Sequence, residues 1–463
     1  MKQTLGRRPK RGKLRLIVAL IVVVGAGYVL WGGLRLGPLP VITMQTDHPA
    51  VGAATKVEAR FTAPAGGLGH VTLEVVQGDR AEVVAERTFR RGSAFNPLPG
   101  DGTASATLEA TVGVKTQPWL KEGPATLRAT ADRFSGPFRS PAPFVFIRAV
   151  TVRTRPPRLE ILSSQNYVTE GGAGVVVMRV GDTAVRSGVR AGTVESVSFP
   201  MPGRGSGERF TLYAVPWDLG DGNQVRAFAE DDAGNRVEVP FLTGFRAAPP
   251  RQDTIHLDDA FLERVVPAIA SRTPGFDASG SLLDQYLAIN GAMRAQILEQ
   301  IRGVLADTQA KFLWSGPFEQ LPNSAMRAGF AQTRTYLYQG RAVDHQTHLG
   351  LDLASTSEAP VPAANGGRIV FAGWLGIYGN AVIIDHGYGL ASLYGHLSSI
   401  DATVGDAVKK GQVIAHTGAT GLAGGDHLHL QIFVQGQSVN PLEWLDGHWI
   451  RNNVTSKLGL PAE

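Results

Sequence analysis

Residues 424–434 read GGDHLHLQIFV, and this stretch carries the strongest indication of both fold and chemistry in the chain. After Asp426 the residues are typical of a β-strand. Positions i and i+2 of a strand share a face about 6.5 Å apart, so His427 and His429 are expected to point the same way while Leu428 points into a core. Two imidazoles placed in this way can act as one metal ligand and one neighbouring base.

A second motif, HLGLD, occupies residues 348–352. On a straight strand His348 and Asp352 would share a face but lie about 13 Å apart. That separation is too large for one zinc ion, whose bonds to nitrogen and oxygen are about 2.0–2.2 Å long. We therefore expect the chain to curl between the two residues, and Gly350 permits such a curl.

Histidines are concentrated in this part of the chain, where eight of the 11 fall between residues 345 and 448. One of them, His396, belongs to the alternating stretch ASLYGHLSS (391–399), in which Ser392, Tyr394 and His396 are expected to share a strand face. Two histidines and one aspartate around a zinc ion leave one position for water, as in hydrolytic zinc sites. The chain has no HExxH, Walker A or G-x-S-x-G sequence, and it has no cysteine, which excludes disulfides and thiol catalysis.

Taken together, the motifs resemble the LytM/lysostaphin family of zinc endopeptidases, in that order and at that spacing. The motifs are HLGLD (348–352), YGHL (394–397), GDAVKKGQVIAHTGATG (405–421) and HLH (427–429). The resemblance covers residues 318–447 and implies a two-layer antiparallel β domain with a groove over the metal.

The same resemblance implies a role for each matching residue. His348, Asp352 and His429 would be the ligands of one zinc ion, and His396 and His427 would activate water and stabilise the oxyanion. Gln431 stands where the family often has Glu, and its neutral amide can still hydrogen-bond. Tyr378 and Asn380 are candidates to line the groove. Structural or surface roles are favoured for the other histidines of this region, His345, His386, His416 and His448.

The N-terminus carries a separate signal. Residues 1–15 hold seven Lys and Arg and no acid, so the remaining chain has a net charge of −2 and a basic nucleic-acid-binding body is excluded. Residues 16–34 are 19 residues without a charge, about 28 Å of helix, close to the roughly 30 Å hydrocarbon core of a bilayer. The positive-inside rule predicts a cytoplasmic tail, a single-pass signal-anchor in the inner membrane and a periplasmic or extracytoplasmic remainder. A cleaved signal peptide is the main alternative, although no A-x-A-like site follows the apolar run.

The region between the apolar segment and residue 247 is predicted to consist of short strands. A weak repeat relates LRATADRFSG (127–136) to VRAFAEDDAG (225–234), which is an offset of 98 residues. That offset is about the size of a β-sandwich domain, so we expect two Ig-like β-sandwiches at 38–152 and 156–247. Each unit is followed by a Pro-Pro-Arg step that is typical of a stiff linker. The pair is a candidate surface for binding an envelope protein.

Residues 253–317 are predicted to form a helical connector, because apolar residues recur at i, i+3, i+4 and i+7 between 257 and 305. Asp258 and Asp259 suit a helix start. The connector is expected to pack on the following domain, with a lid or autoinhibitory role as the alternative. Residues 448–463 are assigned to a C-terminal tail.

The sequence therefore predicts a mainly β, multi-domain protein anchored in the membrane. The expected function is zinc-dependent hydrolysis of peptide cross-links in peptidoglycan, with the peptide stems as substrate. The alternative is a non-catalytic regulator or scaffold that activates or positions other cell-wall hydrolases. Relatives with that role typically lack some of the metal ligands, whereas this chain has all of them.

Overall fold

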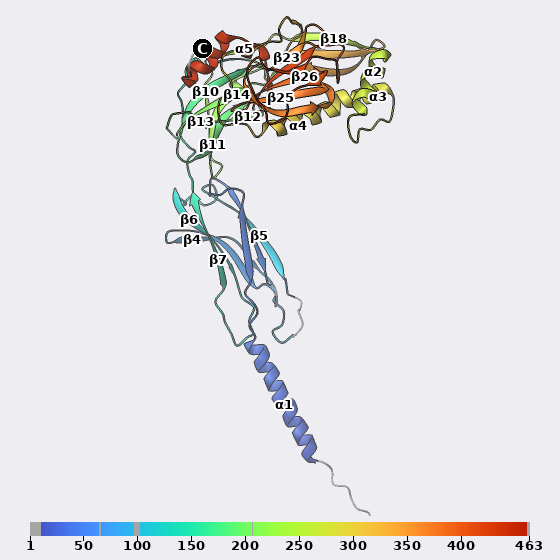
Figure 1. Ribbon diagram of the computed structural model, residues 1–463. Coiled ribbons are helices and arrows are strands. Elements are labelled where there is room, and N and C mark those ends of the chain that lie inside the picture. The colour runs from blue at the N-terminus through green and yellow to red at the C-terminus, as the bar shows by residue number, and fades with distance from the viewer. Residues whose placement is uncertain (1–10, 64–65, 97–101, 206, 461–463) are drawn as a thin grey trace, which may run out of the picture. The chain divides into compact units, whose positions relative to one another are not determined.

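The computed structural model describes residues 11–63, 66–96, 102–205 and 207–460 (Figure 1). They divide into two compact units, one running to Pro156 with Asp231–Asn235 added, and one formed by Pro157–Glu230 and Arg236–Glu463. The fold is mainly β with an apolar N-terminal helix, as expected. Each unit is considered by itself below.

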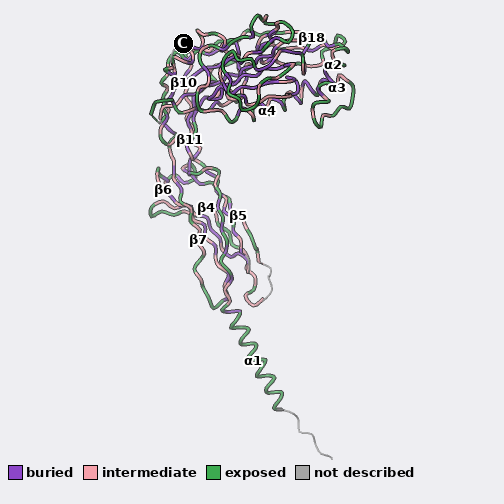
Figure 2. The backbone as a smooth tube through the Cα atoms, viewed as in Figure 1, coloured by how far each residue is buried: buried purple, intermediate pink, exposed green. Residues whose placement is uncertain are grey.

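The first unit begins with the helix α1 (Arg11–Leu34), whose span Gly12–Leu34 has a mean hydropathy of 2.3 and is exposed throughout residues 12–31 (Figure 2). By length and composition this helix can cross a membrane. The strands that follow form a three-stranded antiparallel sheet, β1-β2-β5, and a four-stranded one, β4-β3-β6-β7, around one apolar core. Their bounds are β1 Val41–Thr46, β2 Thr55–Thr62, β3 His70–Gln77, β4 Arg80–Thr88, β5 Ser105–Val112, β6 Gly123–Ala131 and β7 Phe144–Val152.

The second unit begins with another β region, whose two four-stranded sheets have the orders β13-β14-β10-β8 and β12-β11-β15-β16, with a parallel pair β17-β9 beside them. The bounds are β8 Leu159–Ile161, β9 Tyr167–Thr169, β10 Ala173–Val180, β11 Ala184–Ala191, β12 Val194–Val197, β13 Phe199–Pro200, β14 Glu208–Ala214, η1 Gly222–Gln224, β15 Val225–Asp231, β16 Arg236–Pro240 and β17 Gly244–Arg246. One face of this region does not have a core of its own. Val175, Val177, Phe210 and Leu212 belong to the same apolar cluster as the interior of the C-terminal domain.

The connector differs from its expected form at its start. Residues 251–257 form a strand, β18 (Arg251–Leu257), which pairs in parallel with β20 of the C-terminal domain. The helices then follow as expected, with Asp258 capping α2 and Ser281 forming a capping box with Asp284 at α3. The bounds are α2 Asp259–Ala270, α3 Leu282–Ala288, a π-helical turn η2 Ile289–Met293, and α4 Arg294–Leu305.

The C-terminal domain is built on an eight-stranded sheet of order β19-β22-β30-β26-β25-β24-β28, with β31 paired to β30. The domain also contains two three-stranded sheets, β18-β20-β21 and β23-β29-β27. The bounds are β19 Ala325–Ala328, β20 Gln332–Tyr338, β21 Arg341–His348, β22 Leu351–Ala354, β23 Pro360–Pro362, β24 Gly367–Trp374, η3 Gly376–Tyr378, β25 Asn380–Gly387, β26 Leu390–Leu397, β27 Ser399–Ile400, β28 Ala407–Val408, β29 Val413–His416, β30 Leu428–Val434 and β31 Gln437–Val439.

The large sheet has two different faces, and strand β30 shows the difference most clearly. Leu428, Leu430 and Ile432 belong to the core that is shared with the second β region. Phe433, on the other face, packs in a cluster with the apolar side chains of α2, α3 and α4, and α4 runs along this face of the sheet (Figure 1). Because alternate residues of a strand point to opposite faces, His429 lies on the side of the helices.

The segment expected to be a tail continues as short helices instead. Helix α5 (Pro441–Leu445) precedes this segment, which is formed by α6 Gly447–Ile450, η4 Arg451–Thr455 and α7 Ser456–Leu458, and residues 461–463 lie outside the described residues. Ile450, Val454 and Leu458 are buried in the shared core. Their spacing of four residues is the helical signal that the sequence contained.

Candidate metal centre

Strand pairing brings the HLH and HLGLD motifs together. His348 is the last residue of β21 and Asp352 lies in β22, so the chain curls between them at Gly350 as predicted. Asp352 is paired directly with His429 across β22 and β30. A Cβ on Gly350 would lie 2.6 Å from Cε1 and Nε2 of His429, so only glycine allows the imidazole to approach this closely.

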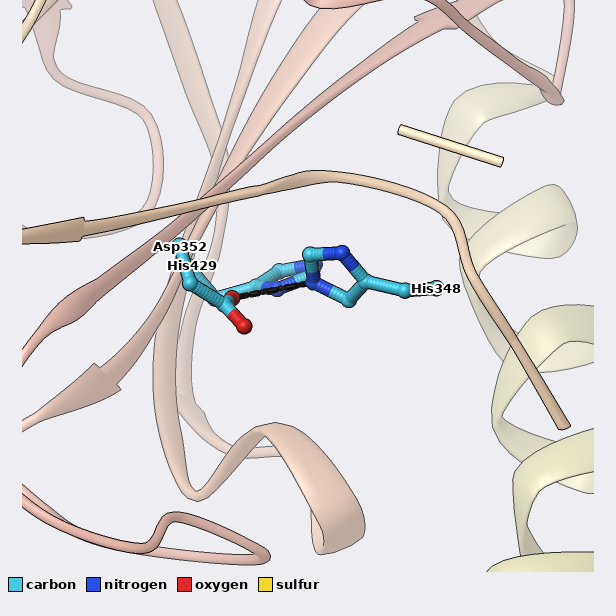
Figure 3. Close-up of side chains that lie close together, drawn as sticks. All are labelled: His348, Asp352 and His429. Carbon is cyan, nitrogen blue, oxygen red and sulfur yellow. Dashed lines mark hydrogen bonds and ion pairs between the residues drawn. The ribbon is translucent and has the colours of Figure 1, made fainter. Parts of the chain in front are cut away.

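The three side chains converge on one point (Figure 3). Oδ1 of Asp352 lies 2.9 Å from Nε2 of His348 and 2.9 Å from Nδ1 of His429, and the two nitrogens are 3.1 Å apart. His348 and His429 are only 6% and 5% exposed. Burial alone would raise the pKa of Asp352, but its contacts with the rings of His348, His427 and His429 outweigh it and hold the pKa well below its usual value.

The outer nitrogen of each ligand histidine faces a hydrogen-bond acceptor. Nδ1 of His348 donates to the carbonyl oxygen of Gly329 at 2.9 Å, and Nε2 of His429 donates to Oε1 of Gln431 at 3.2 Å. A neutral imidazole carries one N–H, so the inner nitrogens present bare lone pairs to the Asp352 carboxylate. Lone pairs and a carboxylate in contact repel one another unless a cation lies between them. The donor set of two nitrogens and one oxygen therefore fits a zinc ion.

Gln431 accepts a hydrogen bond from His429, as the sequence suggested that a neutral amide could at this position. The side chain is fully buried, and its Oε1 also accepts a hydrogen bond from Tyr378 at 2.9 Å. Its Nε2 donates to Oγ of Ser438 at 2.6 Å, which fixes the orientation of the amide. Burial raises the pKa of Tyr378, so its hydroxyl stays protonated as a donor.

His396 and His427 lie beside this cluster with their ring centroids 4.8 Å apart. Nδ1 of His396 donates to the carbonyl oxygen of Thr420 and Nδ1 of His427 to that of Gly425, both at 2.8 Å. In its neutral form each ring then has an unprotonated Nε2, and that of His427 is 3.6 Å from Oδ1 of Asp352. Burial lowers the pKa of His396 to about 3. The structure therefore brings all five predicted site residues together.

One detail of the prediction is wrong. His396 does not share a face with Ser392 and Tyr394, because the pairing of β26 with β25 shifts register between Tyr394 and Leu397, and His396 has a φ of 63°. Ser392 and Tyr394 hydrogen-bond each other among the shared core. The irregularity turns His396 to the opposite face, where its ring centroid is 5.8 Å from that of His429.

Arg334 is a site residue that sequence reasoning missed. Its Nη2 donates to Oδ2 of Asp352 at 3.0 Å, so the two carboxylate oxygens have different partners and Oδ1 alone faces the ligand nitrogens. Arg334 comes from β20, whose pairing with β21 brings it over the motif. No spacing within the motifs points to it, because the contact depends on how two strands pair.

The centre opens into a cavity of about 330 Å³, a volume at the lower end of ordinary ligand sites. Tyr378 lines it, as expected of a groove residue, whereas Asn380 is absent from its lining. The connector contributes Ile255 and Leu257 from β18, Phe261 from α2 and Tyr286 from α3. This segment therefore forms part of the wall of the site in addition to packing on the domain.

The remaining histidines lie outside the centre. His386 is fully buried, with Nδ1 2.6 Å from the carbonyl oxygen of Gly366 and Nε2 2.8 Å from Oγ of Ser392. Burial lowers the pKa of His386 to about 4. His345, His416 and His448 contact Thr335, Ser399 and Arg451 near the surface.

Comparison with known proteins gives a consistent result for this domain. The model of peptidase family M23 matches residues 346–441. The chain is 44% identical over 95 residues to DD-carboxypeptidase/endopeptidase Mpg of Neisseria meningitidis serogroup B, covering 20% of this chain and 22% of that protein. It is 41% identical over 96 residues to Murein hydrolase activator EnvC of Escherichia coli, covering 21% and 23%.

Two shorter proteins are matched over nearly their whole length. Lipoprotein NlpD of Yersinia enterocolitica is 41% identical over 95 residues, which is 20% of this chain and 97% of that protein. The catalytic domain of lysostaphin from Staphylococcus simulans is 30% identical, with 28% of this chain and 98% of that chain covered and a TM-score of 0.25. The chain spans only about a fifth of the length of Mpg and EnvC. Its C-terminal domain belongs to peptidase family M23, the LytM/lysostaphin type.

Proposed function

We propose that the C-terminal domain is a zinc endopeptidase that hydrolyses the peptide cross-links of peptidoglycan. The observation that carries this proposal is the arrangement of the five side chains. Three donors of His348, Asp352 and His429 meet at one point, and two further histidines present unprotonated Nε2 atoms beside them. A zinc ion bound there would act as a Lewis acid and lower the pKa of its water.

The chain's own residues would bind, orient and move protons. Arg334 and the strand pairing hold Asp352, and Gln431 holds His429, so the ligands are positioned before metal or substrate arrives. Nε2 of His427 lies 3.6 Å from Oδ1 of Asp352, and the ring of His396 lies beside it, with its centroid 5.8 Å from that of His429. One of them would take the proton of the attacking water, donate a hydrogen bond to the oxyanion as the imidazolium, and then pass the same proton to the leaving amine.

The proposal is tested by incubating the full chain, purified in detergent, with cross-linked muropeptides and following the products by mass spectrometry. We expect cleavage that stops when a chelator is added and returns with about one equivalent of zinc. A mass increase of one water per cut would identify hydrolysis. Cleavage that continues unchanged in chelator would overturn the metal assignment.

The second candidate function is activation of another wall hydrolase, and a specific observation favours it. Murein hydrolase activator EnvC matches over the same part of the chain at 41% identity. In that case the purified chain alone would leave muropeptides intact, and adding it to an amidase would raise the amidase rate. The complete ligand set supports the peptidase, because a non-catalytic protein does not need His348, Asp352 and His429 to converge.

We further propose that α1 anchors the protein in the inner membrane with its N-terminus in the cytoplasm. The seven cations before the apolar span and the single Arg35 that closely follows it support this orientation. Protease added outside spheroplasts should remove the C-terminal domain and spare the N-terminal tail. The domain limits given above and the role of the β regions in binding an envelope protein stay predictions.

A further inference from the structure

The side chains that line the metal cavity carry more positive than negative charge. Three arginines line it, namely Arg294, Arg327 and Arg334, against the carboxylates of Asp253 and Asp352. Arg334 is paired with Asp352. Among the described residues, Arg294 and Arg327 have no carboxylate within ion-pair distance. A zinc ion would add to this excess, so the cavity is complementary to an anionic ligand.

Arg294 is held in a fixed position at the cavity. Its Nε donates to the backbone carbonyl of Asn290 at 3.1 Å and its Nη2 to the Oδ1 of the same residue at 2.5 Å. Asn290 is fully buried and its Nδ2 donates to Oδ2 of Asp344 at 2.7 Å. A guanidinium has five N–H groups, so three donors of a rigidly held cation stay uncommitted in contacts to the described residues.

The backbone at this point is unusual. The helix that runs from α3 to α4 is interrupted by the π-helical turn η2 (Ile289–Met293), which directly precedes Arg294. π-turns insert an extra residue into a helix and are found frequently at functional sites. Here the turn buries Asn290, and Arg294, which that side chain orients, lines the cavity.

Arg294 is also close to the residues that hold the metal ligands. Arg294 lines the same cavity as His429 and as Tyr378 with its hydroxyl. That hydroxyl donates to Gln431, which in turn accepts from His429. A group bound by Arg294 would therefore lie in the same cavity as the reacting amide.

We propose that Arg294 binds a free carboxylate of the peptide substrate, on a residue next to the cleaved amide. The inference rests on the proposed function and narrows its substrate class to peptides with a carboxylate next to the scissile bond. A guanidinium fork and a carboxylate form two parallel hydrogen bonds, which gives orientation as well as affinity. Arg327, exposed on β19, adds to the field that attracts such a substrate.

The first test compares two substrates that differ only in charge. One is a stem peptide that ends in D-alanyl-D-alanine with a free carboxylate, and the other is its C-terminal amide. We expect the full chain to cleave the free acid with a kcat/KM about 10–100-fold higher. Arg294→Gln should lose that preference through a higher KM for the acid, with the amide unaffected. Arg294→Lys, which keeps the charge without the fork, should lose part of it.

The matched control is Arg302→Gln, which removes an exposed arginine from the same helix α4 outside the cavity. It should leave both substrates unchanged, and thermal melts should show that every variant is folded. Equal cleavage of acid and amide by the wild-type chain would overturn the inference while leaving the proposed function intact. An equal loss for both substrates in Arg294→Gln would overturn it as well.

A binding experiment separates this inference from the proposed function. Titration calorimetry of the two peptides against the zinc-free full chain should show about tenfold tighter binding of the acid, abolished in Arg294→Gln. If neither peptide is cleaved but this preference holds, the carboxylate site stands and the peptidase proposal fails. Equal binding of the acid and the amide would show directly that Arg294 does not bind the carboxylate.

Discussion

Both faces of the eight-stranded sheet bury histidine side chains, but the ring nitrogens of these histidines have complementary hydrogen-bond partners on one face only. On the face toward the second β region, both ring nitrogens of His386 have partners, in the carbonyl of Gly366 and the hydroxyl of Ser392. On the face toward the helices, the inner nitrogens of His348 and His429 meet only each other and Asp352. A buried histidine is therefore a structural element when its partners complement it, and a candidate ligand when bare lone pairs are brought together.

The largest expected effect is that of removing a metal ligand from the sheet face toward the helices. His348→Ala takes away one of three donors, so we expect the zinc content to fall from about one equivalent to near zero and cleavage to fall to the level of the chelated protein. Elemental analysis and the muropeptide assay measure both quantities. A variant that retains stoichiometric zinc would contradict the ligand assignment, and with it the functional reading of this face.

The next effect separates the metal from the acid–base chemistry on the same face. His396→Ala and His427→Ala each remove an unprotonated Nε2 without removing a ligand. We expect zinc to be retained and kcat to fall by roughly 10²–10⁴. His345→Ala, at an exposed position, serves as the control and should behave as wild type. Loss of zinc in His396→Ala or His427→Ala would place that residue among the ligands instead.

A smaller effect is expected where a partner of a ligand is changed. Gln431→Leu removes the acceptor of the His429 N–H and of the Tyr378 hydroxyl. Competition with a calibrated chelator should then show zinc affinity weakened by about 10–100-fold. Gln431→Glu keeps an acceptor and adds negative charge, so it should bind zinc at least as tightly as wild type. Equal affinity in all three proteins would show that this hydrogen bond does not tune the metal.

The same comparison shows how far local sequence pattern reaches. The HLH and HLGLD motifs predicted the ligand set because strand alternation and a glycine curl are local properties. His396 was placed on the wrong face because a register shift in β26 is decided by its neighbour β25. Arg334 and Arg294 could not be found at all, since Arg334 reaches the site through the pairing of β20 with β21 and Arg294 through the packing of a helix that is distant in sequence.

The two β regions show the same limit of sequence-based prediction at the level of domains. The sequence suggested two equivalent modules, yet one face of the second region shares its apolar core with the C-terminal domain. A signal was present in GVVVMRV (174–180), where Val175, Val176, Val177 and Met178 are all buried. A continuous apolar run indicates burial on both faces of a strand. In the first region, β6 is buried at alternate positions only, as expected for a sheet covered on one face.

On the structural face of the sheet a substitution should affect stability and leave chemistry alone. His386→Leu leaves the Gly366 carbonyl and the Ser392 hydroxyl without their partner, so the free energy of unfolding should fall by about 1–3 kcal/mol. Zinc content and kcat of the folded fraction should match wild type. Loss of zinc in this variant would mean that the two faces are coupled and that the contrast between them is too simple.

The smallest effect is the pH dependence of stability that His386 contributes. Burial lowers its pKa from 6.5 to about 4 in the folded chain, so between these values the unfolded chain binds a proton that the folded chain does not. Stability is therefore complete above pH 6.5 and is lost as the pH falls, by about 1–2 kcal/mol between pH 6.5 and 5. The zinc-centre histidines also respond to acid, but they do so equally in wild type and His386→Leu. The difference between their urea unfolding curves should thus shrink toward low pH, and a difference that stays constant would show that folding does not lower the pKa of His386.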